Sequence, residues 1–236
     1  ALGLASGLEI AAALGLLRVM GWTYAGMPSV KRFLQALAAI GAVAPVVGAL
    51  AIAVAFQLLG RPPSAELLQT WWTASMIGAV AILPMVLTFR TALAGDPTKF
   101  CDCARPEFLG TIGLAVATTI AALQLTYYPF VLMALPILLA AGRLGACRTS
   151  AVIVVTVATY LVQSLVVPDL AAGLSARMAG YVSMALVTLP PFLFALQREA
   201  FVYAEHSARA NAALFRRAMH DSAIGMAIVD LDGRFR

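Results

Sequence analysis

One acidic residue, Glu9, lies well inside an apolar stretch that covers residues 1–17. A charged side chain at such a depth costs about 2.5 kcal/mol or more to insert into hydrocarbon, so it usually faces protein or water. Its neighbours one helical turn away, such as Ala5 and Ala12, are small and leave room for a close partner helix. Two roles are open for Glu9: sensing of a ligand or proton, and hydrogen-bonded packing.

Further polar and aromatic side chains occur in or beside the later apolar stretches. They can line a pocket for a small ligand, whose identity the sequence does not give. The alternative is a belt of aromatic side chains at the depth of the lipid headgroups, with hydrogen bonds between helices. Together with Glu9, the candidates for sensing are Trp71, Trp72, Ser75, Tyr127, Tyr160 and Gln163.

The residue types that bind metals or perform catalysis show no productive spacing. Cys101, Cys103 and Cys147 do not supply the four spaced ligands of a structural zinc site, and no histidine has a spaced partner. There is no glycine-rich phosphate loop and no nucleophile with a paired base. We therefore expect no catalytic residue, no metal and no cofactor in this portion, and we leave open whether the full-length protein is an enzyme.

The composition indicates the elements that must position the candidate residues. Hydrophobic residues make up 62% of the 236, and charged residues only 11%, where a soluble domain has about 25%. The net charge of +5 comes largely from short loops, which favours orientation in a bilayer over binding of nucleic acid. The expected fold is an all-α, polytopic transmembrane helix bundle in contact with membrane lipids.

Seven apolar stretches predict membrane spans, since a helix needs about 17–25 residues to cross hydrocarbon. The fifth is short and begins at Pro129. The stretches are 1–17, 33–59, 69–89, 108–125, 129–142, 150–167 and 174–197.

Basic residues mark every second loop and the tail that opens with Arg198. Because Lys and Arg concentrate on the cytoplasmic side, the tail is predicted to be cytoplasmic. We also expect that helices precede residue 1.

The segment after the last span carries a heptad pattern. Phe201, Ala208 and Phe215 recur at one seam position, and Ala204 and Asn211 at the other. A polar Asn at such a position sets register and strand number in coiled coils. The pattern predicts a parallel homodimer, and a single amphipathic juxtamembrane helix that packs on its own domain is the alternative.

Three stretches resemble the first membrane-associated sensor (MASE) family. They are "LASGLEIAAALGLLR" (4–18), "WWTASMIGAVAILPMVL" (71–87) and "PFVLMALPILLAAGRLG" (129–145). The resemblance covers most of 1–197 and implies a sensory module of the bacterial inner membrane. The family often has an acidic residue shortly after the tryptophans. This chain has Ser75 there, so a charge-based role at that point does not carry over.

The closing stretch, "LFRRAMHDSAIGMAIVDLDGRFR" (214–236), is similar to the entrance of a PAS domain, with a short helix followed by a strand. The resulting division is a sensor module at 1–197, a signalling-helix linker at 198–213, and the start of a PAS domain at 214–236. In related arrangements a diguanylate cyclase, a cyclic di-GMP phosphodiesterase or a histidine kinase follows.

The expected function is detection of a small molecule, lipid or membrane state, with regulation of a cytoplasmic output. Cyclic di-GMP turnover is the first choice for that output, and a histidine kinase is the alternative. A secondary transporter is a second alternative, compatible with Glu9 and with Pro45, Pro84 and Pro136 inside the apolar stretches. Transporters often show two repeated halves, and the sequence has no convincing internal repeat.

Overall fold

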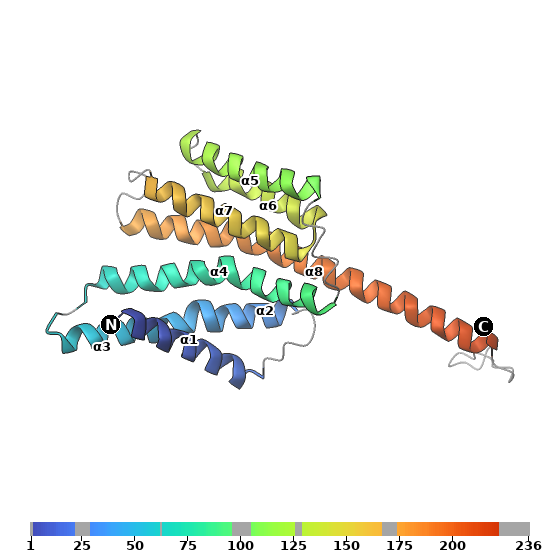
Figure 1. The fold of residues 1–236 in the computed structure, drawn as a ribbon, viewed down its shortest axis with the longest axis horizontal. Coiled ribbons are helices and arrows are strands. Elements are labelled where there is room, and N and C mark those ends of the chain that lie inside the picture. Colours follow the sequence, from blue (N-terminus) through green and yellow to red (C-terminus); the bar gives the residue numbers. More distant parts are fainter. Residues whose placement is uncertain are drawn as a thin grey trace, which may run out of the picture. The chain divides into compact units, whose positions relative to one another are not determined.

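The computed structural model describes residues 2–21, 29–61, 63–95, 105–125, 129–166 and 174–221. Every regular element in these ranges is helical, which confirms the all-α class (Figure 1). The chain forms two compact units, Ala1–Gln197 and Arg198–Arg236. The helices are α1 (Leu2–Val19), α2 (Val30–Leu37), a π-helical segment η1 (Ala38–Val43), α3 (Ala44–Leu58), α4 (Ala65–Gly95), α5 (Pro106–Leu125), α6 (Pro129–Arg143), α7 (Ala146–Val166) and α8 (Leu174–Asp221).

Five helical stretches in the described residues are long and apolar enough to cross a membrane. The short α6 and the N-terminal α1 are not among them. The structure therefore supports a multi-pass membrane protein, while the count of seven spans stays a prediction. The five are Val30–Leu58, Ala65–Phe89, Pro106–Leu125, Ala146–Val166 and Ala179–His220.

Local sequence signals set several helix ends. The Ser29 hydroxyl accepts from the backbone N–H of Arg32 at 3.3 Å at the start of α2. The Ser64 hydroxyl does the same for Leu67 at 3.2 Å, just before α4. Serine is a favoured N-cap because its oxygen satisfies an N–H that the helix leaves unpaired. Gly60, with a φ of 69°, follows the end of α3, a conformation that glycine adopts without steric cost.

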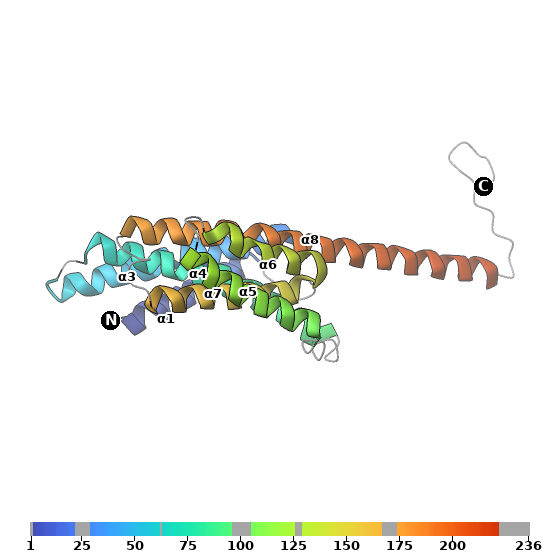
Figure 2. The same ribbon diagram turned by 90° about the horizontal axis from the view of Figure 1, so that it is seen from above.

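In the first unit, α4 lies between two groups of helices (Figure 1). α3 packs against α1 and α4, whereas α7 packs against α4, α5 and α6. Figure 2, which views the ribbon from above, shows most helices of this unit with their axes broadly aligned. The rings of Phe33 in α2 and Phe192 in α8 lie 4.9 Å apart and are completely or almost completely buried. The core thus draws on both ends of this unit's sequence.

Buried polar groups in the core are paired. The hydroxyls of Thr88 in α4 and Ser150 in α7 are 3.1 Å apart and buried. Thr88 also donates to the carbonyl of Pro84 at 2.7 Å, one turn earlier in the same helix. Among the described residues, no buried side-chain nitrogen or oxygen lacks a hydrogen-bond partner. Such pairing is required where no water is at hand.

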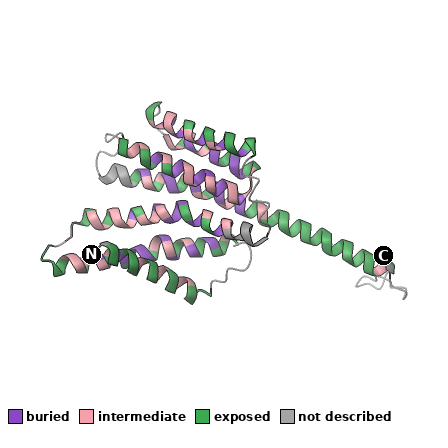
Figure 3. Cartoon of the chain, in the orientation of Figure 1, coloured by how far each residue is buried: buried purple, intermediate pink, exposed green. Residues whose placement is uncertain are grey.

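Many residues of the first unit are exposed (Figure 3), and they include many large apolar side chains. Examples are Leu50, Val131, Leu138 and Leu186, each more than half exposed. Soluble monomers rarely expose apolar patches of this extent. Contact with lipid hydrocarbon explains this surface.

The described part of the second unit is the C-terminal portion of α8. Residues 201–218 are all exposed, including Phe201 at 70% and Phe215 at 55%. An ion pair joins Glu205 to Arg209 one turn further along. The helix has no break at residue 213, and the strand expected in 222–236 lies outside the described residues.

Candidate functional site

Glu9 and Trp71 form a hydrogen bond between two helices that are far apart in the sequence. The indole Nε1 of Trp71 in α4 donates to the Oε2 of Glu9 in α1 at 3.0 Å. Both side chains are partly buried. Two of the residues singled out from the sequence are therefore brought together.

A glycine makes this contact sterically possible. Gly48, in α3, is buried directly beside the pair. A Cβ atom at this position would lie 2.8 Å from the Glu9 Oε2 and 2.8 Å from the Trp71 Nε1. The bare backbone of α3 thus provides the space in which the side chains from α1 and α4 meet. The result is a junction of three helices, which we call the Glu9 junction: Glu9, Gly48 and Trp71.

Trp72 makes a second interhelical hydrogen bond, next to the first. Its Nε1 donates to the carbonyl oxygen of Ala42, in η1, at 3.1 Å. This carbonyl belongs to a π-helical turn in which the N–H of Ala44 bonds to the oxygen of Ala39, five residues back. Pro45 follows at once and has no N–H to offer the preceding turn. The indole therefore braces a distorted segment of the helix.

The indole N–H groups of Trp71 and Trp72 both donate hydrogen bonds to protein oxygens, so they are not available to lipid headgroups. The two consecutive tryptophans connect α4 to α1 and to η1. This arrangement favours interhelical hydrogen bonding over an aromatic belt for these two residues.

The other predicted sensing residues occupy different places. Ser75 is half-buried, about one turn after the tryptophans in α4. Tyr160 is buried in α7, with its ring 5.9 Å from that of Phe130 in α6. Gln163 is half-buried three residues further along α7. Tyr127 lies outside the described residues.

Tyr160 also rests against a second close-approach glycine. A Cβ atom at Gly180 in α8 would lie 2.6 Å from the Tyr160 hydroxyl oxygen and 3.8 Å from the Phe130 ring. Neither Gly48 nor Gly180 was singled out from the sequence. Glycine inside an apolar span is the signal that points to such sites, because small residues let helices approach closely.

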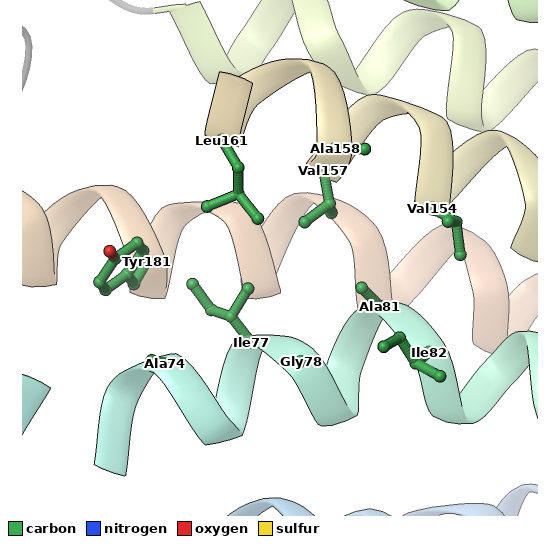
Figure 4. Close-up of a pocket in the computed structure, with 10 residues that line it drawn as sticks. All are labelled: Ala74, Ile77, Gly78, Ala81, Ile82, Val154, Val157, Ala158, Leu161 and Tyr181. Atoms are coloured by element: carbon green, nitrogen blue, oxygen red, sulfur yellow. The ribbon is translucent and has the colours of Figure 1, made fainter. Parts of the chain in front are cut away.

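An apolar groove of about 260 Å³ lies between α4 and α7, and α8 contributes Tyr181 at one end of it (Figure 4). Small side chains on α4 create much of its space, and a Cβ atom added at Gly78 would meet nothing within 4 Å. The one hydroxyl among the lining side chains is that of Tyr181. The lining residues are Ala74, Ile77, Gly78, Ala81, Ile82, Val154, Val157, Ala158, Leu161 and Tyr181.

The described site consists of hydrogen bonds between helices and an apolar groove. Among the described residues, no group of three or more His, Cys, Asp or Glu side chains could hold a metal ion. A carboxyl group that accepts from an indole is a link between helices, and a ligand group that competes for the carboxyl oxygen would break it. The groove, by contrast, offers shape and apolar contact.

Comparison with known proteins gives no relative for this chain. No family model, no curated protein and no solved structure matches it.

Proposed function

We propose that the chain is a sensory module of the bacterial inner membrane that passes a signal to a cytoplasmic output through α8. The observation that carries the proposal is the contrast along this helix. Residues such as Met184, Phe192 and Leu196 are buried, whereas every described residue from 201 to 218 is exposed. One continuous helix thus has a buried part and, over the described residues 201–218, an exposed part.

The exposed part has an apolar seam that favours a second copy of the chain. An isolated helix of this length is marginal in water without packing of an apolar face. Phe201, Ala208 and Phe215 occupy one seam position of the heptads, and all three are exposed. A parallel homodimer would bury them, and a change in its packing would carry the signal.

The Glu9 junction supports a role in signal detection. Its hydrogen bond links α1 to α4 beside the Gly48 backbone of α3, so a change at Glu9 or Trp71 alters how α1 and α4 are held together. A ligand that acts on the Glu9 junction is proposed to be small, since the surroundings are closely packed. The alternative signal is a state of the membrane itself.

The finer assignments rest on resemblance. We propose a MASE-type module with seven spans and a cytoplasmic C-terminus, followed by a PAS domain. The proposed output is cyclic di-GMP turnover, with histidine kinase input as the alternative. A secondary transporter is less well supported, because transport gives no role to an exposed helix of this length. Incubation of membranes holding the full-length protein with GTP, and then with ATP, separates the outputs by product.

Cysteine crosslinking tests the proposed dimer. In a background with the three native cysteines replaced by serine, Ala208→Cys places a thiol on the seam and Ala213→Cys places one on the opposite face. Both are exposed alanines of the same helix. Disulfide-linked dimers in native membranes are expected for Ala208→Cys and not for Ala213→Cys. Equal yields at both positions, or none at either, would contradict the proposal.

A further inference from the structure

We propose that the groove between α4 and α7 binds a neutral, single-chain lipid from the bilayer, whose small hydroxyl or carbonyl end bonds to Tyr181. Such a lipid would be the ligand of the proposed sensory module. That its binding regulates the output rests on the proposed function.

The shape of the groove fits one extended apolar chain. Its α4 wall runs from Ala74 to Ile82, which spans roughly 12 Å at 1.5 Å per residue. Its α7 wall runs from Val154 to Leu161. Apart from Tyr181, the side chains around it are aliphatic (Figure 4). Such a surface attracts hydrocarbon and gives no partner to a polar molecule.

The depth of the groove excludes a charged headgroup. α4 is long and apolar enough to cross a membrane over Ala65–Phe89, and Ile77 lies at the midpoint of that stretch. The groove is therefore centred in the middle of the hydrocarbon, where a charge is costly. A ligand that fills the groove must have a small, uncharged polar end.

Tyr181 supplies the one group that can recognise that end. It lies at one end of the groove in Figure 4, close to Ala74 and Leu161. In the described part of the chain no hydrogen bond is seen to its hydroxyl, and Tyr160 in α7 is its electrostatic neighbour. A hydroxyl without a partner in hydrocarbon is unfavourable, and a hydroxyl or carbonyl oxygen on the ligand would satisfy it. Tyr181 is on α8, the helix proposed to carry the signal.

The test uses photolabelling of the purified protein in phosphatidylethanolamine–phosphatidylglycerol vesicles. The probe is hexadecanol with a diazirine on its chain, with unlabelled hexadecanol as competitor. Labelled peptides are expected from the α4 and α7 walls. Gly78→Phe fills the groove from a position with open space, so labelling there is expected to fall about tenfold, as for a lost apolar anchor. Gly113→Phe is the matched control, since Gly113 in α5 also has open space and does not line the groove.

Two further variants keep the proposal falsifiable if Gly78→Phe does not fold. Ala74→Leu fills the tyrosine end of the groove and is expected to lower labelling as well. Tyr181→Phe keeps the shape and removes the hydroxyl, which is expected to weaken labelling about fivefold. Labelling that is equal in all variants, or that spreads evenly over exposed residues such as Leu138, would overturn the proposal.

A separate readout distinguishes failure of the site from failure of the sensory function. The disulfide yield at Ala208→Cys is measured with and without hexadecanol. Specific photolabelling together with a changed yield supports both proposals. Specific photolabelling with an unchanged yield keeps the lipid site and overturns its signalling role.

Discussion

Gly48→Ala is the substitution that tests the Glu9 junction most sharply. The added methyl would lie 2.8 Å from both hydrogen-bonded atoms and 3.3 Å from the Glu9 Cβ. Contacts this short cannot persist, so one side chain must move and the 3.0 Å hydrogen bond is lost. Loss of such a bond costs about 1–3 kcal/mol across neutral and charged acceptors. Replacement of glycine by alanine in a helix returns about 1 kcal/mol of propensity.

A matched glycine removes the propensity term from the comparison. Gly113→Ala introduces the same methyl into α5, where no atom lies within 4 Å. The difference between the two variants in free energy of unfolding is therefore expected to be about 1–3 kcal/mol, with Gly48→Ala the less stable. Unfolding by SDS titration in mixed micelles, followed by circular dichroism, measures it.

A double-mutant cycle assigns the effect to the hydrogen-bonded pair. In a Trp71→Phe background the indole nitrogen is gone, so Gly48→Ala should cost less than it does in the unmodified protein. If Gly48→Ala is as harmless as Gly113→Ala, or costs the same in both backgrounds, then the reasoning about the junction is wrong.

Three further substitutions probe the neighbouring contacts by the same unfolding assay. Glu9→Gln keeps an acceptor oxygen and is expected to change stability by less than about 1 kcal/mol; a larger loss would show that the charge itself is needed. Trp72→Phe removes the donor to the Ala42 carbonyl and is expected to cost about 1–3 kcal/mol, because that oxygen is left unsatisfied away from water; no loss would contradict the bracing role. Gly180→Ala places a methyl 2.6 Å from the Tyr160 hydroxyl and should lower the free energy of unfolding by about 1–3 kcal/mol through overpacking. Adding Tyr160→Phe, which removes that hydroxyl, should recover most of the loss. If it recovers nothing, the overpacking does not involve the Tyr160 hydroxyl.

The sequence predicted the helices well because hydrocarbon imposes a simple rule. A segment that crosses a bilayer must be apolar and must satisfy its own backbone, so apolar stretches become helices. The stretch 174–197 illustrates both the success and its limit. It is helical, and its helix continues without a break through the heptad-patterned linker to Asp221, so the sequence predicted the helix but not that it would be continuous.

The candidate site was predicted only in part. Small neighbours around Glu9 predicted a close partner helix, but not that Trp71 would be the hydrogen-bond donor. That pairing depends on how α1, α3 and α4 pack together, which a single sequence does not specify. Gly48 was missed for the same reason, since its role exists only once two other helices approach it.

The contact between Trp72 and Ala42 required knowledge of the backbone. Pro45 indicates a disturbed helix, but the sequence does not say whether the disturbance is a kink, a π turn or a helix end. The structure shows a π turn whose carbonyl accepts from an indole. The groove was missed because it arises from small residues on two helices that meet side by side.

Coupling between the bundle and the linker is the central claim, and the disulfide yield at Ala208→Cys measures it directly. The yield is compared in native membranes for Gly48→Ala and Gly113→Ala, at equal amounts of inserted protein. A bias of about 1 kcal/mol between two packings changes their ratio about fivefold, so Gly48→Ala is predicted to change the yield by a factor of that order while Gly113→Ala leaves it unchanged. Identical yields in the two variants would contradict a signalling path from the Glu9 junction through α8.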